Sequence, residues 1–402
     1  MTSPRIPRRS LVLGAGLVAG SALLPAGAFA QAKEIKLGQT MPYSGPASAY
    51  GTIGKVQQAY FKMINDQGGI NGRMVNLVSL DDGYSPPKAV EHVRKLVEQE
   101  EVVALFQTLG TPSNSAIHKY VNAKKVPQLF VATGATKWND PKAYPWTFGF
   151  NLSYQTEGEI YARYLLKNKP NAKIALLYQN DDYGKDVLTG VKRGLGSAAG
   201  KMIVAEQTYE VTDPTVDSQI LTLKASGADT FINICTPKFS AQAIRKVADS
   251  GWQPLHIVNN VGASVGSVLK PAGLDKSVGL VTVQYYKDAN DPQWKDDPAM
   301  LQWRGFMGKY YRDGNVADAS NIYGVIAAEL MVQVLKQCGN DITRDNIRKQ
   351  AENIKNFKSG LLLPGITLST SATDHAPVDQ AQLSKFDGKQ WVLFGQVLGG
   401  SQ

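Results

Sequence analysis

Cysteine and histidine are scarce in this sequence, with two cysteines and four histidines among 402 residues. Two cysteines exclude a disulfide-rich scaffold. The scattered histidines form no HExxH pair and have no CxxC partner, so we expect no metal site. Charged residues make up 19% and hydrophobic residues 43%, a balance that excludes a disordered or fibrous chain. We therefore expect a globular protein of about two domains.

Familiar catalytic and nucleotide-binding motifs are also missing. The sequence has no GxSxG elbow and no GxxxxGK[ST] phosphate loop. Gly14, Gly16 and Gly20 follow an apolar run and imitate a dinucleotide-binding turn. However, no acidic residue precedes Glu34, and such a turn needs a βαβ unit with an acid about 20 positions on. We expect a protein that is not an enzyme and that uses no cofactor.

The first thirty residues have the three parts of an export signal. A basic start containing Arg8-Arg9 is followed by an apolar run over 11–20, and Ala28-Phe29-Ala30 gives a small-x-small ending. The run is too short to span a membrane, which needs about 20 apolar residues. The paired arginines resemble a twin-arginine (Tat) signal. We expect residues 1–30 to be removed by cleavage after Ala30 and the mature protein to reside in the periplasm.

The net charge of +9 carries little functional information. Three of its positive charges, from Arg5, Arg8 and Arg9, belong to the export signal. The other basic residues are spread out without a basic run, so nucleic acid is not an expected partner. In an oxidising compartment Cys235 and Cys338 can either form a disulfide or remain buried free thiols.

The rest of the chain alternates strand-like and helix-like segments, and the pattern restarts after about Asn151. Such alternation is typical of α/β folds with helices over parallel sheets. A final hairpin over 382–395 is expected at Asp387-Gly388. The other expected strands are 34–40, 74–80, 102–106, 126–132, 173–178, 202–209, 230–235, 255–259 and 278–285. The expected helices are 51–65, 86–98, 113–123, 157–168, 184–199, 218–225, 240–250, 299–312 and 320–337.

Hydroxyl residues and glycines follow three of the first four expected strands. They occupy 41–51, 109–115 and 133–136. Ligands of open α/β sheets bind beyond the carboxyl ends of the strands, where helix N-termini also point. Hydroxyl and backbone N–H donors there can hold a carboxylate without a full counter-charge. One such loop also fits an ordinary N-cap, but three in consecutive units indicate a ligand site.

Other polar groups at strand ends carry weaker signals. Asp81-Asp82 and Asp181-Asp182 are adjacent carboxylates, whose side chains usually point apart, so we expect turn and cap roles for them. None of the loops above contains a histidine. A secreted hydrolase would need a nucleophile with a nearby base, so this alternative is not favoured.

Several motifs in these loops give the chain a resemblance to a known family. They resemble those of the branched-chain amino acid type of ABC-transporter solute-binding protein, and their order matches over nearly all of 33–395. The motifs are Ser44-Gly45-Pro46 with Tyr50-Gly51, Asp66 with Gly68-Gly69-Ile70-Asn71-Gly72-Arg73, Gly110-Thr111-Pro112, and Asp182-Tyr183-Gly184.

The resemblance implies a type I periplasmic-binding fold: two Rossmann-like α/β lobes joined by three hinge crossovers, with the solute in the cleft. Lobe 1 would comprise 33–150 plus 284–358, and lobe 2 would comprise 151–283 plus 359–400. The two cysteines then lie in different lobes. A bridge between them would hinder closure of the lobes, which favours free thiols.

The resemblance also implies a function. The protein is expected to be a monomer that captures a small carboxylate-bearing solute by two-lobe closure and delivers it to an inner-membrane ABC permease. An alternative is a ligand-sensing receptor subunit of the same fold that feeds a membrane signalling protein. Tyr50 would line the pocket, Gly110 and Thr111 would hold the carboxylate, and Tyr183 would close over the solute. The full set of expected ligand-binding residues is Tyr50, Leu109, Gly110, Thr111, Thr133, Gly134, Ala135, Thr136, Tyr183, Thr236, Asn260 and Tyr285.

One departure from the family bears on the solute. Family members that bind α-amino acids place an acid after the strand expected at 255–259, where this chain has Asn259-Asn260-Val261. Asparagine cannot neutralise an ammonium group, and burying that group unpaired costs several kcal/mol. An aromatic or aliphatic acid, or a neutral amide, therefore fits better than leucine. Hydrophobic amino acids stay open if Asp181 or Asp182 supplies the charge.

Overall fold

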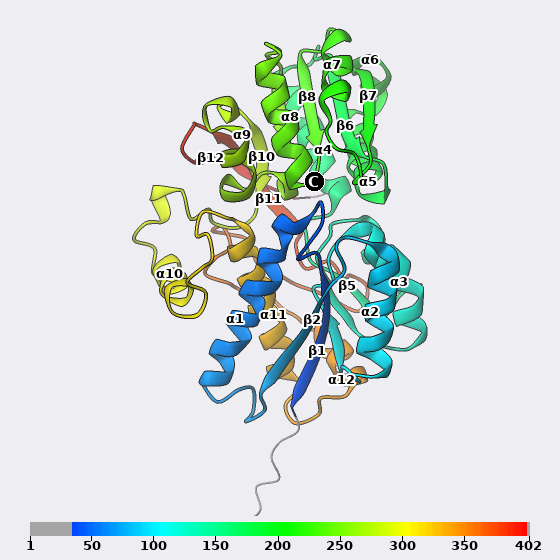
Figure 1. Cartoon of the computed structure of the whole chain (residues 1–402), viewed down its shortest axis with the longest axis vertical. Helices are drawn as coiled ribbons and strands as arrows, with labels where there is room; N and C mark the ends of the chain where they lie inside the picture. The colour runs from blue at the N-terminus through cyan, green and yellow to red at the C-terminus, as the bar shows by residue number, and fades with distance from the viewer. Residues whose placement is uncertain (1–33, 400–402) are drawn as a thin grey trace, which may run out of the picture. The chain divides into compact units, whose positions relative to one another are not determined.

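Two β-sheets organise the chain, of which the computed structural model describes residues 34–399. The first sheet has the order β2-β1-β3-β4-β5, and its paired strands are parallel. The second has the order β12-β11-β10-β9-β8-β6-β7, in which β11 runs antiparallel to both β10 and β12. Figure 1 shows the first sheet in the lower half of the view and the second in the upper half.

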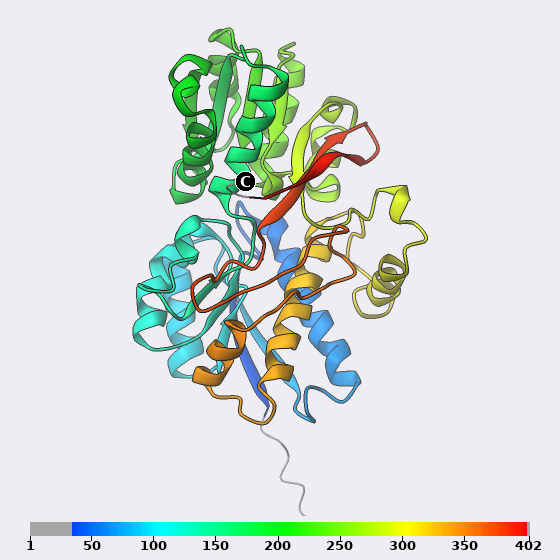
Figure 2. The same cartoon turned by 180° about the vertical axis from the view of Figure 1, so that it is seen from behind.

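The first sheet is covered by helices on both faces. Buried apolar residues of α2 and α3 pack against β3 on one face, whereas α1 and α11 pack against each other on the other face (Figures 1 and 2). The strands are β1 (Ile35–Met41), β2 (Val75–Asp81), β3 (Ala104–Phe106), β4 (Gln128–Val131) and β5 (Thr147–Gly149). The helices are η1 (Ser48–Tyr50), α1 (Gly51–Asp66), α2 (Pro86–Glu98), α3 (Thr111–Ala123), η2 (Thr136–Trp138), α10 (Pro298–Tyr310), α11 (Ser320–Gln337) and α12 (Arg344–Ala351).

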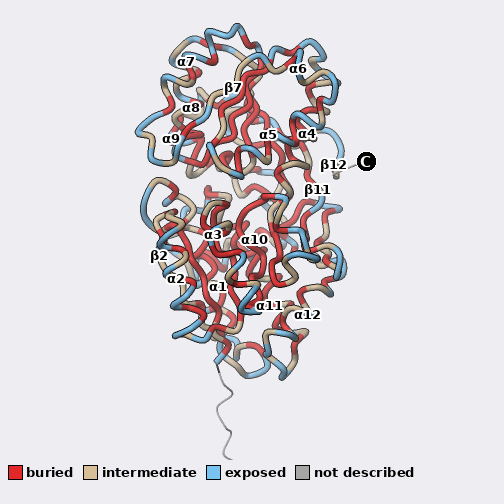
Figure 3. The backbone as a smooth tube through the Cα atoms, turned by 90° about the vertical axis from the view of Figure 1, so that its right-hand side faces the viewer, coloured by how far each residue is buried: buried red, intermediate tan, exposed pale blue. Residues whose placement is uncertain are grey.

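The second sheet has a buried centre, since every residue of β8 is buried (Figure 3). Its strands are β6 (Ile174–Gln179), β7 (Ile203–Tyr209), β8 (Thr230–Ile234), β9 (Leu255–Val258), β10 (Val281–Gln284), β11 (Gln380–Phe386) and β12 (Trp391–Gly399). Its helices are α4 (Tyr154–Asn168), α5 (Asp182–Leu195), α6 (Ala199–Met202), α7 (Asp217–Ala225), α8 (Pro237–Asp249) and α9 (Lys270–Ala272). Short turns are η3 (Gly196–Ala198), η4 (Asn260–Gly262), η5 (Val265–Leu269), η6 (Asp275–Ser277) and η7 (Pro292–Trp294).

Helices α4 and α5 approach each other closely because glycines form their contact. A Cβ atom on Gly158 would lie 2.4 Å from the carbonyl oxygen of Val187, and one on Gly190 would lie 2.2 Å from that of Gln155. Both distances are far below van der Waals contact. The two backbones can therefore pack at this distance only while these positions lack side chains.

The chain passes between the two sheets and their helices three times. The first passage leads from β5 of the first sheet to α4, which packs on α5. The second follows β10 of the second sheet. The third follows α12 and leads to β11, which belongs to the second sheet. This arrangement confirms two α/β units with three crossovers. The exact lobe boundaries, near residues 150, 283 and 358, stay predictions.

The predicted order of strands and helices is confirmed, although strand β5 and helices α6, α9 and α12 were not predicted and some predicted bounds were too long. Strand β5 and helix α12 are short, and no strong periodicity marks them. The helix expected over 184–199 ends at Leu195, because Gly196 adopts a φ of 55° and turns the chain. The predicted export signal lies outside the described residues.

Several other features of residues 34–399 bear on the sequence analysis. Cys235 and Cys338 are both buried free thiols. In this part of the chain, no helix is both long enough and apolar enough for a membrane crossing. Likewise, no cluster of three histidine, cysteine or acidic side chains within it has the geometry to hold a metal ion.

Candidate functional site

A cavity with about 840 Å³ of empty space, including its open side, lies at the carboxyl ends of strands from both sheets. Leu109 and Thr133 follow β3 and β4 of the first sheet, while Thr236 and Asn260 follow β8 and β9 of the second. This is the edge of an open α/β sheet at which ligands bind. A molecule in the cavity would contact both units.

Helix N-termini surround this cavity. Residues at the first positions or N-caps of α1, α3, α4, α8 and α11 are among its lining: Tyr50, Gly110, Thr111, Tyr154, Thr236, Ala319 and Ser320. The first N–H groups of a helix have no intrahelical partner, and the helix dipole places partial positive charge there. For α3, α4 and α8, no capping side chain uses these donors. The arrangement favours an anionic group such as a carboxylate.

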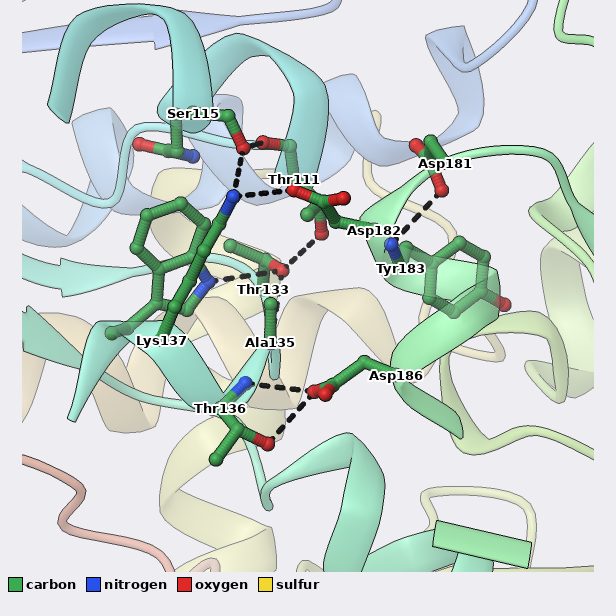
Figure 4. Close-up of polar contacts among 12 residues, drawn as sticks. Thr111, Ser115, Thr133, Ala135, Thr136, Lys137, Asp181, Asp182, Tyr183 and Asp186 are labelled. Carbon is green, nitrogen blue, oxygen red and sulfur yellow. Dashed lines mark hydrogen bonds and ion pairs between the residues drawn. The ribbon is translucent and has the colours of Figure 1, made fainter. Parts of the chain in front are cut away.

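The loop before α3 is fixed from beneath by a buried hydrogen-bond network. The amide of Asn114 donates to the carbonyl oxygens of Thr108 (2.9 Å) and Gly110 (2.8 Å). Its Oδ1 accepts bonds from the Thr108 hydroxyl (2.6 Å) and from Nε2 of Gln128 (2.6 Å). The hydroxyls of Thr111 and Thr133 are 2.5 Å apart and link this loop to the one after β4 (Figure 4). The donors of the loop are thereby held in place before a ligand arrives.

Aromatic side chains form much of the cavity wall. Six tyrosines line it: Tyr50, Tyr84, Tyr154, Tyr183, Tyr286 and Tyr323. The rings of Tyr154 and Tyr183 are 4.9 Å apart, and the Tyr183 hydroxyl donates to Oδ1 of Asn259 at 2.7 Å. The Tyr50 hydroxyl donates to the carbonyl oxygen of Val261 at 3.0 Å, which joins the two units. Such walls suit a solute with an apolar or aromatic part.

The charges around the cavity are unusual. Within the described chain, no lysine, arginine or histidine lines it, and Asp288 is its one carboxylate. Asp288 is 4% exposed, and burial raises the pKa of its carboxyl group. An anionic part of a solute must therefore be held by N–H and hydroxyl donors, because no side-chain cation reaches it.

Asn260 lines the cavity but is tied to groups behind it. Its Nδ2 donates to the carbonyl oxygen of Val283 at 2.7 Å, and its backbone N–H donates to Oε1 of Glu157 at 2.7 Å. The Tyr161 hydroxyl donates to the same Oε1 at 2.5 Å. Burial raises the pKa of Glu157 to about 7. The Glu157 carboxyl thus supports the turn after β9, and it is not among the lining groups.

The loop after β4 contacts helix α5 beside the lining residues Thr133 and Tyr183 (Figure 4). Lys137 Nζ lies 2.5 Å from a carboxylate oxygen of Asp182 and 2.6 Å from the Ser115 hydroxyl. The N–H and hydroxyl of Thr136 each donate to Oδ2 of Asp186 at 2.8 Å. We call these contacts the mouth bridge. They join the two units, so they form only while the units are close together.

Removal of the ion pair in the mouth bridge should weaken solute binding modestly. For Lys137→Ala we expect about a two- to fivefold rise in Kd, mainly through faster dissociation, since exposed pairs contribute up to about 1 kcal/mol. Raising the salt concentration should reduce the difference from wild type. Stopped-flow titration at two ionic strengths measures both effects. Lys119→Ala, at an exposed lysine of α3 for which no ion pair is found in residues 34–399, is the control. A Lys137→Ala protein indistinguishable from it would contradict this role.

The structure brings eight of the twelve predicted site residues to the cavity and leaves four elsewhere. The eight are Tyr50, Leu109, Gly110, Thr111, Thr133, Tyr183, Thr236 and Asn260. Gly134, Ala135 and Thr136 line a neighbouring cavity instead, because the chain turns after Thr133 toward α5. Tyr285 is buried directly behind Tyr286, with 4.8 Å between the ring centres.

Sequence reasoning missed several lining residues. Tyr84 follows β2 and so obeys the same strand-end rule as the predicted loops; the N–H of Tyr84 donates to Asp82 at 2.8 Å in a tight turn. Tyr286 and Asp288 follow β10, where the chain leaves the second sheet. No pattern marked these two positions. Asp181 and Asp182 were open candidates, but neither is among the lining residues.

Comparison with known proteins agrees with this geometry. A family model described as periplasmic binding protein matches residues 34–390. The Leu/Ile/Val-binding protein homolog 7 of Brucella suis biovar 1 (strain 1330) is 27% identical over 258 residues, which cover 62% of this chain. The match spans 63% of the length of that relative.

Solved structures show the same fold. A branched-chain amino acid ABC transporter from Thermus thermophilus with bound valine is 17% identical, with a TM-score of 0.83 and coverage of 92% of this chain and 97% of its own. A fatty acid ABC transporter substrate-binding protein from Thermomonospora curvata is 22% identical, with a TM-score of 0.76 and coverage of 92% and 93%. These likenesses confirm the type I periplasmic-binding fold. The chain belongs to the periplasmic binding protein family.

Proposed function

We propose that the protein is the extracytoplasmic solute-binding component of an ABC import system. It captures a small carboxylate-bearing solute by closure of two lobes and passes it to an inner-membrane permease. The observation that carries the proposal is a cavity lined from both sheets and surrounded by helix N-termini. Residues that bind a solute from both sides favour the closed arrangement, because the solute contacts both lobes only when they close.

The proposed solute has two parts. Its carboxylate accepts hydrogen bonds from the N-terminus of α3 and from one hydroxyl of the Thr111–Thr133 pair, since the other hydroxyl donates within the pair. Its apolar or aromatic part lies against the tyrosines, with Tyr183 covering it. The lining contains no cation among the described residues, so the carboxylate is recognised by dipoles and not by an ion pair. Aromatic acids, aliphatic acids and hydrophobic amino acids all meet these requirements.

The relatives support this class of solute. The names of the two solved structures above refer to valine and to fatty acids, both of which carry a carboxylate and an apolar part. The proposed lobes keep the predicted boundaries, 33–150 plus 284–358 and 151–283 plus 359–400. The family consists of solute-binding proteins, and its name places them in the periplasm.

A thermal-shift screen tests the proposal. The purified protein is melted with a panel of aromatic acids, aliphatic acids and hydrophobic amino acids, each as the free acid and as its methyl ester. We expect at least one free acid to raise the Tm and its ester to have little effect, because the ester lacks the carboxylate. Stabilisation follows RT ln(1 + [L]/Kd), which is about 2.7 kcal/mol at a hundredfold excess over Kd. A panel in which no compound moves the Tm contradicts the proposed function.

A further inference from the structure

Asp288 is a buried carboxylate for which residues 34–399 provide no ion-pair partner. Its Oδ1 accepts hydrogen bonds from the N–H (2.8 Å) and the Nδ2 (2.7 Å) of Asn290. No hydrogen bond to its Oδ2 is found among residues 34–399. The neighbouring Lys287 is directed to another acid, since its Nζ lies 2.7 Å from Asp297. An ionised carboxylate at 4% exposure is costly unless it is paired.

Three other acids near the site already have partners. Asp181 caps α5 by accepting from the N–H groups of Tyr183 and Gly184, and Asp182 pairs with Lys137. Glu157 accepts bonds from Tyr161 and from the backbone of Asn260. None of these three acids lines the cavity within the described chain, whereas Asp288 does. Within the described chain, Asp288 is therefore the acid whose carboxylate can contact a solute in the cavity.

The backbone around Asp288 is anchored, and the two hydrogen bonds from Asn290 hold its carboxylate. Tyr286 forms a β-bridge with Leu362, and the N–H of Lys287 donates to the carbonyl oxygen of Leu361 at 2.8 Å. The Asn290 side chain also donates to the carbonyl oxygen of Ala317 at 3.2 Å. These contacts fix the segment that follows β10 on both sides of Asp288. A charge held in this way is prepared for a partner of opposite sign.

We propose that Asp288 binds the ammonium group of the solute and so makes the cavity selective for amine-bearing carboxylates. The inference rests on the proposed function, because it assigns the second charged group of the same solute. Asp288 would replace the acid that is absent at Asn259-Asn260-Val261. The solute would then be a zwitterion with its carboxylate toward the N-terminus of α3 and its ammonium toward Asp288. This reverses the preference for amine-free acids expected from the sequence.

The test compares three compounds that differ in one group. L-leucine, 2-hydroxy-4-methylpentanoate and 4-methylpentanoate carry an ammonium, a hydroxyl and a hydrogen at the same carbon. The aromatic set is L-phenylalanine, 3-phenyllactate and 3-phenylpropanoate. Titration calorimetry of the wild-type protein should give affinity for an amine-bearing member that is about 100-fold or more above that for its hydroxyl and amine-free counterparts, because a buried charge pair is lost.

Substitution of Asp288 should remove this preference. We expect Asp288→Asn to lower affinity for the amine-bearing compound by about 100-fold while affinity for the amine-free acid is kept or improved. Asp288→Glu, which retains the charge, should keep the order of preference. Asp291→Asn changes a nearby buried acid that does not line the cavity and should leave the order unchanged. If Asp288→Asn fails to fold, the Asp288→Glu protein and the wild-type series still decide the matter.

Two failures are distinguishable. If the wild-type protein binds amine-free acids as tightly as amine-bearing ones, the role of Asp288 is overturned while the proposed function stands. The same holds if Asp288→Asn keeps the wild-type order of preference. If no acid or amino acid of either set or of the wider panel binds, the proposed function fails and this inference fails with it.

Discussion

Gly110→Ala should weaken solute binding severely. Gly110 adopts a φ of 95°, a conformation that costs a residue with a Cβ about 1–3 kcal/mol. A Cβ there would also lie 2.6 Å from Cε2 of Tyr84, and that ring is buried in the cavity wall. The loop must shift to relieve both effects, and the N–H groups at the start of α3 move with it. We expect Kd for the best acid of the screen to rise by about 100-fold or more.

A second glycine separates backbone strain from damage to the site. Gly365 has a φ of 88°, and no atom lies within 4 Å of a Cβ built there. Gly365→Ala should lose a similar amount of stability but keep its affinity. Thermal melting gives the stability of each variant, and calorimetric titration gives Kd. Wild-type affinity in a folded Gly110→Ala protein would show that this loop does not hold the solute.

Gly190→Ala should destabilise the protein by about 3 kcal/mol or more. A Cβ at Gly190 would meet backbone atoms of Gln155 at 2.2, 2.6 and 2.7 Å. Overpacking a core costs about 1–3 kcal/mol when side chains can yield, and here the obstacle is the backbone of α4. Intrinsic helix propensity acts the other way, since alanine is favoured over glycine by about 1 kcal/mol. We expect the clash with the α4 backbone to outweigh helix propensity, so the free energy of unfolding should fall.

The matched control is a glycine in a helix that touches nothing. Gly308 lies on an exposed position of α10, and a Cβ there would meet no atom within 4 Å. Gly308→Ala should therefore stabilise the protein by about 0.5–1 kcal/mol. Urea midpoints from circular dichroism measure both variants. If Gly190→Ala matches Gly308→Ala, the close approach of α4 and α5 is not needed for stability.

Much of the fold could be predicted because the signals are local. Continuous apolar runs such as 174–177 mark strands buried on both faces, and amphipathic segments between them mark helices. The rule that ligands lie beyond strand ends then led to the loops that contain Thr111 and Thr133, while the family resemblance led to Tyr183. The short elements β5 and α12 were missed because three and eight residues give too little periodicity.

The rest of the site depends on contacts between distant segments. Asp288 and Tyr286 reach the cavity because the chain leaves β10 and is held at Leu361 and Leu362, more than 70 positions later. The direction of individual side chains could not be predicted either. Thr136 follows the expected strand, but its hydroxyl donates to Asp186 of α5. Neither fact is encoded in the residues nearby.

The pairing of β10 with β11 has a consequence for how the chain folds. Val281 pairs with Lys385, so the second sheet gains its last two strands from residues about a hundred positions further along. Contacts this distant in sequence slow folding, because a long loop must close first. Until β11 arrives, one edge of β10 stays open to wrong partners. A chain cut short before Gln380 should therefore be prone to aggregate.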